Sequence, residues 1–151
     1  MNILLLTLII FMSSFGITSQ NGDPMAVTTD PGQVTLYETA YDAGVIGLLA
    51  HNYLAGESFY QLDPGERLYL GRQAYQVREI IQYQVITPYE FLDLTTGEIL
   101  TGEEAIQAVY LDRPGALVLQ TCLERYGDPD WGLTFWVAYK TTNRQPSQMP
   151  K

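Results

Sequence analysis

The sequence contains a single histidine, His51, and a single cysteine, Cys122. A cysteine attacks a carbonyl group as its thiolate, so a nucleophilic cysteine needs a nearby cation or general base that populates this form. Histidine can hold a proton at neutral pH and then donate it to a leaving amine. The two residues could therefore carry out thiol-based acyl transfer if the fold brings them together, although they stand far apart in sequence.

Three other roles for these two residues compete with acyl transfer: structural packing, redox chemistry and metal binding. Free cysteine often packs as a small buried apolar side chain, and a lone histidine can be an ordinary surface or core residue. A thiol redox reaction would need a resolving cysteine from another molecule. One histidine and one cysteine supply too few ligands for structural zinc, and the acidic segments lack the spacing of a calcium loop. We therefore predict no metal site and no cofactor.

Both residues stand at the end of an apolar segment that has the composition of a buried strand. His51 directly follows VIGLLA (45–50), and Cys122 is the last residue of GALVLQTC (115–122). The end of a core strand can hold a side chain rigidly while leaving it accessible to a substrate. This placement favours a reactive role for both residues.

The remaining elements predict a mainly antiparallel sheet or barrel. Apolar and polar residues alternate through QAYQVREIIQYQVI (73–86), which indicates a long half-buried strand. A two-residue link that begins with glycine joins it to RLYL (67–70), as in a tight hairpin. LTFWVAY (133–139) is a further strand candidate. Thr101 and Glu104 form a capping box that predicts a helix, and a shorter helical turn is expected within 55–62.

Composition and charge limit the class of protein. A chain of 151 residues with 46% hydrophobic residues can bury a core as one domain without disulfide bonds. Seventeen acidic residues against eight basic ones give a net charge of −9. This charge disfavours nucleic acid as a partner, because binding to phosphates needs clustered lysine and arginine.

The chain divides into four predicted segments. Residues 1–19 contain an apolar run that is too short to span a bilayer comfortably and fits a signal peptide or an N-terminal anchor. Residues 20–33 have the composition of a linker, and residues 141–151 that of a loose polar tail. The folded domain is then expected over residues 34–140, outside the cytoplasm.

Two segments resemble the sortase family of cysteine transpeptidases. In LLAHNYLAGESFYQLDPGERLYL (48–70), the histidine follows a core strand, and Phe59, Leu62 and the Gly65-Glu66 step match the pattern that comes after it. In ALVLQTC (116–122), the ending Leu119-Gln120-Thr121-Cys122 is similar to the Leu-x-x-Thr-Cys strand of these enzymes. The resemblance extends over residues 45–139.

The resemblance implies a sortase-like eight-stranded β-barrel with one or two short helices. It also implies that Cys122 attacks a peptide carbonyl in a sorting signal, while His51 protonates the leaving amine and activates the incoming nucleophile. An amine acceptor at the cell surface would then resolve the acyl-enzyme, whereas water would make the protein a thiol protease. The implied location is extracytoplasmic, either secreted or anchored at the outer face of the cytoplasmic membrane.

One departure from the family pattern concerns an arginine. Sortases carry this residue on the strand after the cysteine, and the matching position here, near Leu133, is not basic. Arg125 could approach the site from the loop, but it matches nothing in the motif, and a solvent-exposed charge is the competing interpretation. The alternative to an active enzyme is therefore a secreted binding or scaffold module that keeps the fold with weakened or lost catalysis.

Overall fold

The computed structural model describes residues 6–141. Residues 1–5 and 142–151 are not described, so the predicted polar tail (141–151) lies outside the described residues apart from Thr141.

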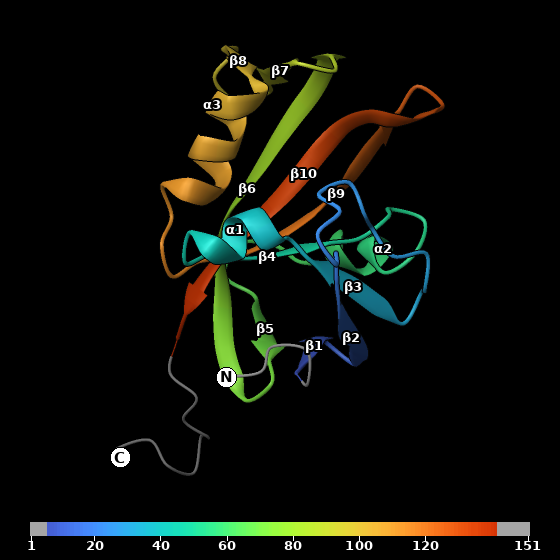
Figure 1. The fold of residues 1–151 in the computed structure, drawn as a ribbon, viewed down its shortest axis with the longest axis vertical. Helices are drawn as coiled ribbons and strands as arrows, with labels where there is room; N and C mark the ends of the chain where they lie inside the picture. The colour runs from blue at the N-terminus through green and yellow to red at the C-terminus, as the bar shows by residue number, and fades with distance from the viewer. Residues whose placement is uncertain (1–5, 142–151) are drawn as a thin grey trace.

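Eight strands of one ten-stranded sheet close into a barrel (Figure 1). The strand order is β10-β9-β4-β3-β2-β1-β5-β6, and pairing between β6 and β10 completes the ring. The barrel strands are β1 (Thr7–Ile10), β2 (Ser13–Ser19), β3 (Gln33–Leu36), β4 (Ile46–Leu49), β5 (Arg67–Leu70), β6 (Gln73–Thr87), β9 (Leu117–Arg125) and β10 (Asp128–Lys140). The prediction of a mainly β, eight-stranded barrel is confirmed.

The remaining elements extend or cover the barrel. Strands β7 (Glu90–Asp93) and β8 (Ile99–Thr101) continue the sheet beyond β6. The helices are α1 (Glu38–Asp42), α2 (Gly56–Phe59) and α3 (Gly102–Ile106), and α3 continues as the π-helical segment η2 (Gln107–Leu111). Residues 6–141 thus contain three short α-helices, where one or two were expected. In this part of the chain no helix is long and apolar enough to cross a membrane.

Local sequence signals account for several of these elements. The alternating segment forms β6, and Gly71, at a φ of 58°, begins the two-residue turn that joins β5 to it. Thr101 caps α3 by accepting a hydrogen bond from the Glu104 backbone, and the Glu104 side chain bonds back to the Thr101 backbone. The segment between β9 and β10 is a tight hairpin, in which Tyr126 and Gly127 both have positive φ values and form a two-residue turn.

The folded domain begins earlier than the boundary expected at residue 34. Strands β1 and β2 pair with each other, β1 also pairs with β5, and β2 pairs with β3. Leu8 and Ile10 are 0% and 1% exposed in the barrel core. A short apolar run has the same composition in a signal peptide and in a buried strand, so its periodicity does not separate the two.

Replacing Leu8 with alanine tests whether these two strands belong to the stable protein. Loss of a fully buried leucine should lower the free energy of unfolding by about 2–5 kcal/mol, as measured by urea denaturation. Met12→Ala is the control, because Met12 is 99% exposed in the turn between β1 and β2. Equal stability of the two variants would show that residues 7–19 contribute nothing to the folded domain.

Two hydrophobic clusters lie on opposite faces of the β9–β10 pair. The first fills the barrel and includes Leu48, Leu117, Leu119 and Trp136. The second lies outside the barrel, beneath α1, α3 and η2, and includes Val118, Phe135 and Val137. Because side chains alternate along β9, Cys122 belongs to the outer face together with Val118 and Gln120.

Candidate active site beside β4 and β9

Parallel pairing of β4 with β9 brings together the two segments that carry the histidine and the cysteine. Leu49 is opposite Gln120, and the Ala50 backbone N–H donates to the Gln120 carbonyl oxygen over 3.1 Å. The Thr121 hydroxyl then donates to the Ala50 carbonyl oxygen over 2.7 Å, across a separation of 71 residues. His51 and Cys122 are the next residues in the two segments and have the same separation. His51 and Cys122 therefore each directly follow a residue of the Ala50–Thr121 contact.

The start of α2 holds both segments in place. The backbone N–H groups of Leu54 and Gly56 each donate to the His51 carbonyl oxygen over 3.0 Å. A Cβ atom on Gly56 would lie 2.3 Å from the Thr121 Oγ1 atom and 2.7 Å from the His51 carbonyl oxygen. Only glycine fits in this contact, which joins the residue before Cys122 to the backbone of His51.

The backbone of Cys122 is held from the other side by Tyr60. The Tyr60 hydroxyl donates to the Cys122 carbonyl oxygen over 2.6 Å and lies 2.9 Å from the Thr134 Oγ1 atom. The Tyr60 ring packs edge-on against Trp136, whose indole N–H donates to the Leu62 carbonyl oxygen. The segment that follows α2 is therefore anchored to both β9 and β10.

The Cys122 side chain is half-buried beside the Asp130 carboxylate. Burial, the negative charge of Asp130 and a hydrogen bond with Asp130, in that order of size, together raise the pKa of the Cys122 thiol from 9.0 to about 11. At neutral pH the thiol is therefore protonated, with a thiolate fraction of about 10⁻⁴. Attack by this cysteine requires a group that removes the proton.

Replacing Asp130 with asparagine should make Cys122 more reactive. Without the neighbouring negative charge, the pKa of the thiol falls from about 11 towards 9.0, although burial remains the largest cause of the shift. We expect the alkylation rate with iodoacetamide at pH 8 to rise by about threefold to tenfold. Asp63→Asn removes an equal charge elsewhere and should leave the rate unchanged. A slower reaction in Asp130→Asn would show that Asp130 assists ionisation.

Neither of the two positions considered for a basic residue, Leu133 and Arg125, supplies a cation next to the Cys122 thiol. Leu133 is directly opposite Cys122 in the β9–β10 ladder, so the position matched to the sortase arginine is apolar. The Arg125 guanidinium stacks on the Trp131 ring at 4.9 Å from its centroid. Strand alternation also places Arg125 and Cys122 on opposite faces of β9. Arg125 therefore does not replace the missing residue.

An apolar pocket of about 350 Å³ lies on the same face as Cys122. Leu133 and Gln120 line it from β10 and β9, Leu49 lines it from β4, and aromatic side chains such as Tyr83 and Phe91 form much of the remaining wall. The Tyr110 hydroxyl donates to Gln120 Oε1, which orients the Gln120 amide. The Nε2 group of Gln120 has no hydrogen-bond partner within residues 6–141, so it can donate to a bound molecule.

Sequence reasoning did not identify Asp130, Gln120 or Gly56 as parts of this region. Asp130 comes eight positions after Cys122 in a strand that no periodicity predicts, and only the β9–β10 hairpin brings it back to the thiol. Gly56 lies within the predicted helical turn, but its contact with Thr121 depends on the packing of distant segments. Gln120 could have been found, because it precedes Cys122 by two residues in a strand and so shares its face.

Comparison with known proteins defines the fold. No protein-family model matches the chain, and no curated protein matches it by sequence. Solved structures of sortases do match. Sortase C1 of Streptococcus agalactiae has a TM-score of 0.59 and 15% identity, over 94% of this chain and 69% of that one. Sortase C1 of Streptococcus suis has a TM-score of 0.63 and 12% identity, over 95% and 75%. Sortase A of Listeria monocytogenes has a TM-score of 0.57 and 10% identity, over 93% and 89%.

The chain is a closed β-barrel with a cysteine on the strand that pairs in parallel with the histidine-bearing segment. This architecture is the sortase fold, in a divergent form.

Proposed function

We propose that the protein is a cysteine transpeptidase or peptidase in which Cys122 is the nucleophile and His51 is the general acid and base. The observation that supports the proposal is the parallel pairing of β4 with β9, which brings together the segments that carry His51 and Cys122. Contacts of Thr121, Gly56 and Tyr60 hold the backbone of both segments, and a rigid backbone favours a reactive group.

The reaction would begin with a peptide in the apolar pocket beside Cys122. His51 accepts the thiol proton, and the sulfur attacks the peptide carbonyl carbon and forms a C–S bond. The C–N bond of the peptide then breaks, and His51 gives the proton to the leaving amine. An amine acceptor, or water, attacks the thioester in the second half and releases the thiol.

The missing arginine leaves the developing oxyanion without a cation from β10. The Gln120 Nε2 group is a neutral donor on the same face, oriented by Tyr110. A preorganised donor of this kind is commonly worth about 10²–10³ in rate. We propose that Gln120 binds the substrate backbone next to the scissile bond and partly compensates for the apolar Leu133.

The proposed substrate is a protein that bears a sorting-signal peptide, and the proposed acceptor is an amine at the cell surface. The pocket walls are apolar and aromatic, so they suit an apolar residue of such a signal. An extracytoplasmic location is part of the same proposal and is supported by the likeness to sortases.

The test is covalent trapping of the native protein with a peptidyl vinyl sulfone that carries an apolar residue. Mass spectrometry should find one adduct, on Cys122, and Cys122→Ala should give none. A matched reagent without the peptide portion should react more slowly, because it does not use the pocket. Modification of Cys122 only after denaturation would exclude the enzyme.

A second candidate function is a binding or scaffold module that keeps the fold and has lost the chemistry. Two observations favour it: the pKa of Cys122 is raised to about 11, and Leu133 is opposite the thiol. Such a module would still bind peptides in the apolar pocket. It predicts saturable peptide binding with no adduct on Cys122, whereas the enzyme predicts both.

A further inference from the structure

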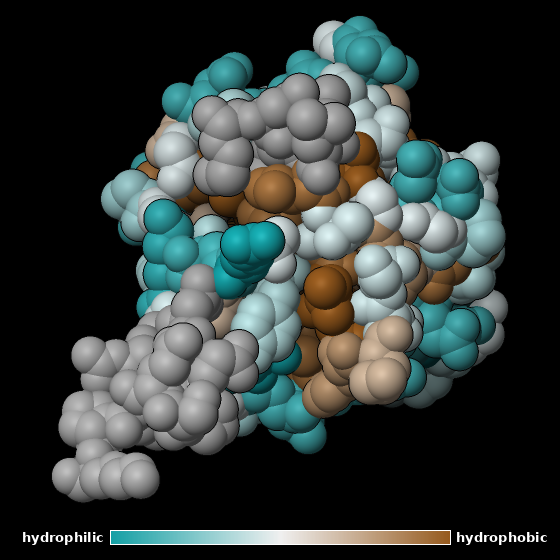
Figure 2. All heavy atoms as spheres, turned by 90° about the horizontal axis from the view of Figure 1, so that it is seen from below, coloured by the Kyte–Doolittle hydropathy of each residue, from teal (hydrophilic) through white to brown (hydrophobic). Residues whose placement is uncertain are grey.

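A larger cavity, of about 730 Å³, lies at the end of the barrel remote from Cys122. It is lined by the first residues of β1 and β4, by the residues just before β9, by the turn between β5 and β6, and by the last residue of β10. Ala116 in its wall precedes Cys122 by six residues of extended strand, or about 20 Å. Figure 2 shows this end of the molecule from below, with apolar residues gathered near the middle of the face. The cavity is therefore separate from the proposed active site, and its role does not rest on the proposed function.

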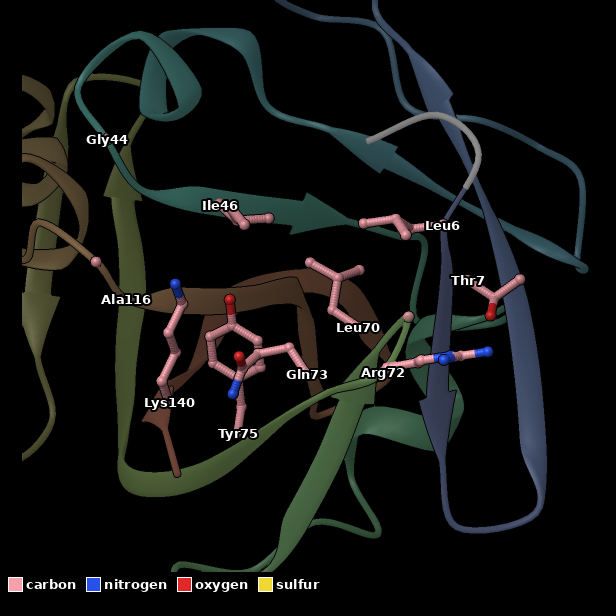
Figure 3. A pocket seen from close by; sticks show the side chains of 12 residues that line it. Leu6, Thr7, Gly44, Ile46, Leu70, Arg72, Gln73, Tyr75, Ala116 and Lys140 are labelled. Carbon is pink, nitrogen blue, oxygen red and sulfur yellow. The ribbon is translucent and has the colours of Figure 1, made fainter. Parts of the chain in front are cut away.

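The cavity is apolar along one side, and two cationic residues, Lys140 and Arg72, also line it. Leu6, Ile46 and Leu70 point into it from three strands or their flanks (Figure 3). Lys140 and Tyr75 are directly opposite each other in the β6–β10 ladder, so their side chains lie on the same face. Among residues 6–141, no aspartate or glutamate lines the cavity, although the chain carries a net charge of −9.

Two polar groups of the cavity, the Lys140 ammonium and the Tyr75 hydroxyl, are available to bind a ligand. The Lys140 ammonium makes no ion pair with residues 6–141, and the Tyr75 hydroxyl has no hydrogen-bond partner there. The Gln73 amide, in contrast, already donates to the carbonyl oxygens of Ala74 and Thr141. Lysine and tyrosine together supply a charge and a donor that suit a carboxylate.

We propose that this cavity binds an amphiphile with a carboxylate head and a medium-length alkyl chain. The carboxylate accepts hydrogen bonds from Lys140 and Tyr75, and the chain lies against Ile46, Leu70 and Leu6. The volume falls within the range of about 300–1,000 Å³ that is usual for small-molecule sites, and the mouth of a β-barrel is a common place for them. A carboxylate is favoured over a neutral or cationic head because every charged residue that lines the cavity within the described part of the chain is positive.

The experiment is calorimetric titration of the full chain with decanoate below its micellar concentration. We expect saturable binding of one decanoate per chain. Decyltrimethylammonium, which has the same chain and the opposite charge, and acetate, which lacks the chain, should each bind at least about tenfold more weakly. Equal binding of decanoate and decyltrimethylammonium would overturn the proposal, as would the absence of decanoate binding.

Charge-reversal variants test the head-group contact. Lys140→Glu should weaken decanoate binding by about tenfold or more, whereas Arg78→Glu, an equal change at an exposed position of β6 outside the cavity, should not. If Lys140→Glu does not fold, Lys140→Gln serves in its place, with a loss of several-fold expected. Equal effects of the Lys140 and Arg78 variants would place the charge dependence outside the cavity and contradict the proposal.

The native protein and its Lys140 variant also test two other occupants of this cavity, the C-terminal segment of the chain and a second copy of the protein. Nuclear Overhauser contacts between the Met149 methyl group and Leu70 in the ligand-free protein would make the chain's own C-terminal segment the occupant. Dimerisation that Lys140→Glu abolishes, measured by analytical ultracentrifugation, would make it a second copy. Either result would overturn the amphiphile site.

Discussion

Replacing His51 with alanine is expected to lower the rate of Cys122 modification by a peptidyl electrophile by about 10²–10⁴-fold at pH 7. The physical reason is the state of the thiol. Its pKa is raised to about 11 by burial and by Asp130, so the unassisted thiolate is scarce at neutral pH. His51 follows the segment that pairs with β9, and it is the only histidine in the sequence that could accept the proton.

The pH profile separates a loss of proton transfer from a loss of structure. In His51→Ala, the modification rate should rise about tenfold per pH unit from pH 7 towards the thiol pKa of about 11. The native protein should react faster at neutral pH and depend less steeply on pH. Tyr53→Leu is the control, because it removes the ring that stacks on His51 at 5.2 Å and leaves the imidazole in place. Identical profiles for native protein and His51→Ala would remove His51 from the mechanism.

Replacing Gly56 with alanine is expected to destabilise the protein and to disrupt the site at the same time. The added Cβ would lie 2.3 Å from Thr121 Oγ1, 2.7 Å from the His51 carbonyl oxygen and 2.8 Å from Thr121 Cβ. Thr121 cannot move away freely, because its hydroxyl bonds to Ala50. We expect a loss of about 1–3 kcal/mol in the free energy of unfolding, together with a fall of about 10²-fold in Cys122 modification as the two strand ends separate.

The chain offers a matched control for this substitution. Gly102 is also the first residue of a short helix, but the nearest atom to a Cβ there is Phe91 Cε2, at 3.8 Å. Gly102→Ala should therefore keep both stability and reactivity. Urea denaturation and the electrophile assay are measured on both variants. Gly56→Ala with native stability and native reactivity would show that α2 does not position the site.

Local patterns predicted the elements whose signals are contained within a few residues. The alternation in β6, the glycine turn at Gly71 and the capping box of Thr101 with Glu104 are all of this kind. The apolar run near the N-terminus is different, because Leu8 is buried only through pairing with β2 and β5. Nothing within the run itself distinguishes a strand from a leader segment.

The sequence by itself determined which groups are available for chemistry: one imidazole, one thiol, and an apolar residue where an arginine was expected. It also predicted that each follows or ends an apolar strand; His51 does follow β4, whereas Cys122 lies inside β9, which continues to Arg125. Only the tertiary structure decided that β4 pairs with β9, since the register of two parallel strands depends on contacts across 71 residues. It also brought Asp130 to the thiol and Gly56 against Thr121. Strand pairing and burial are properties of segments that meet in space, and no local periodicity encodes which segments meet.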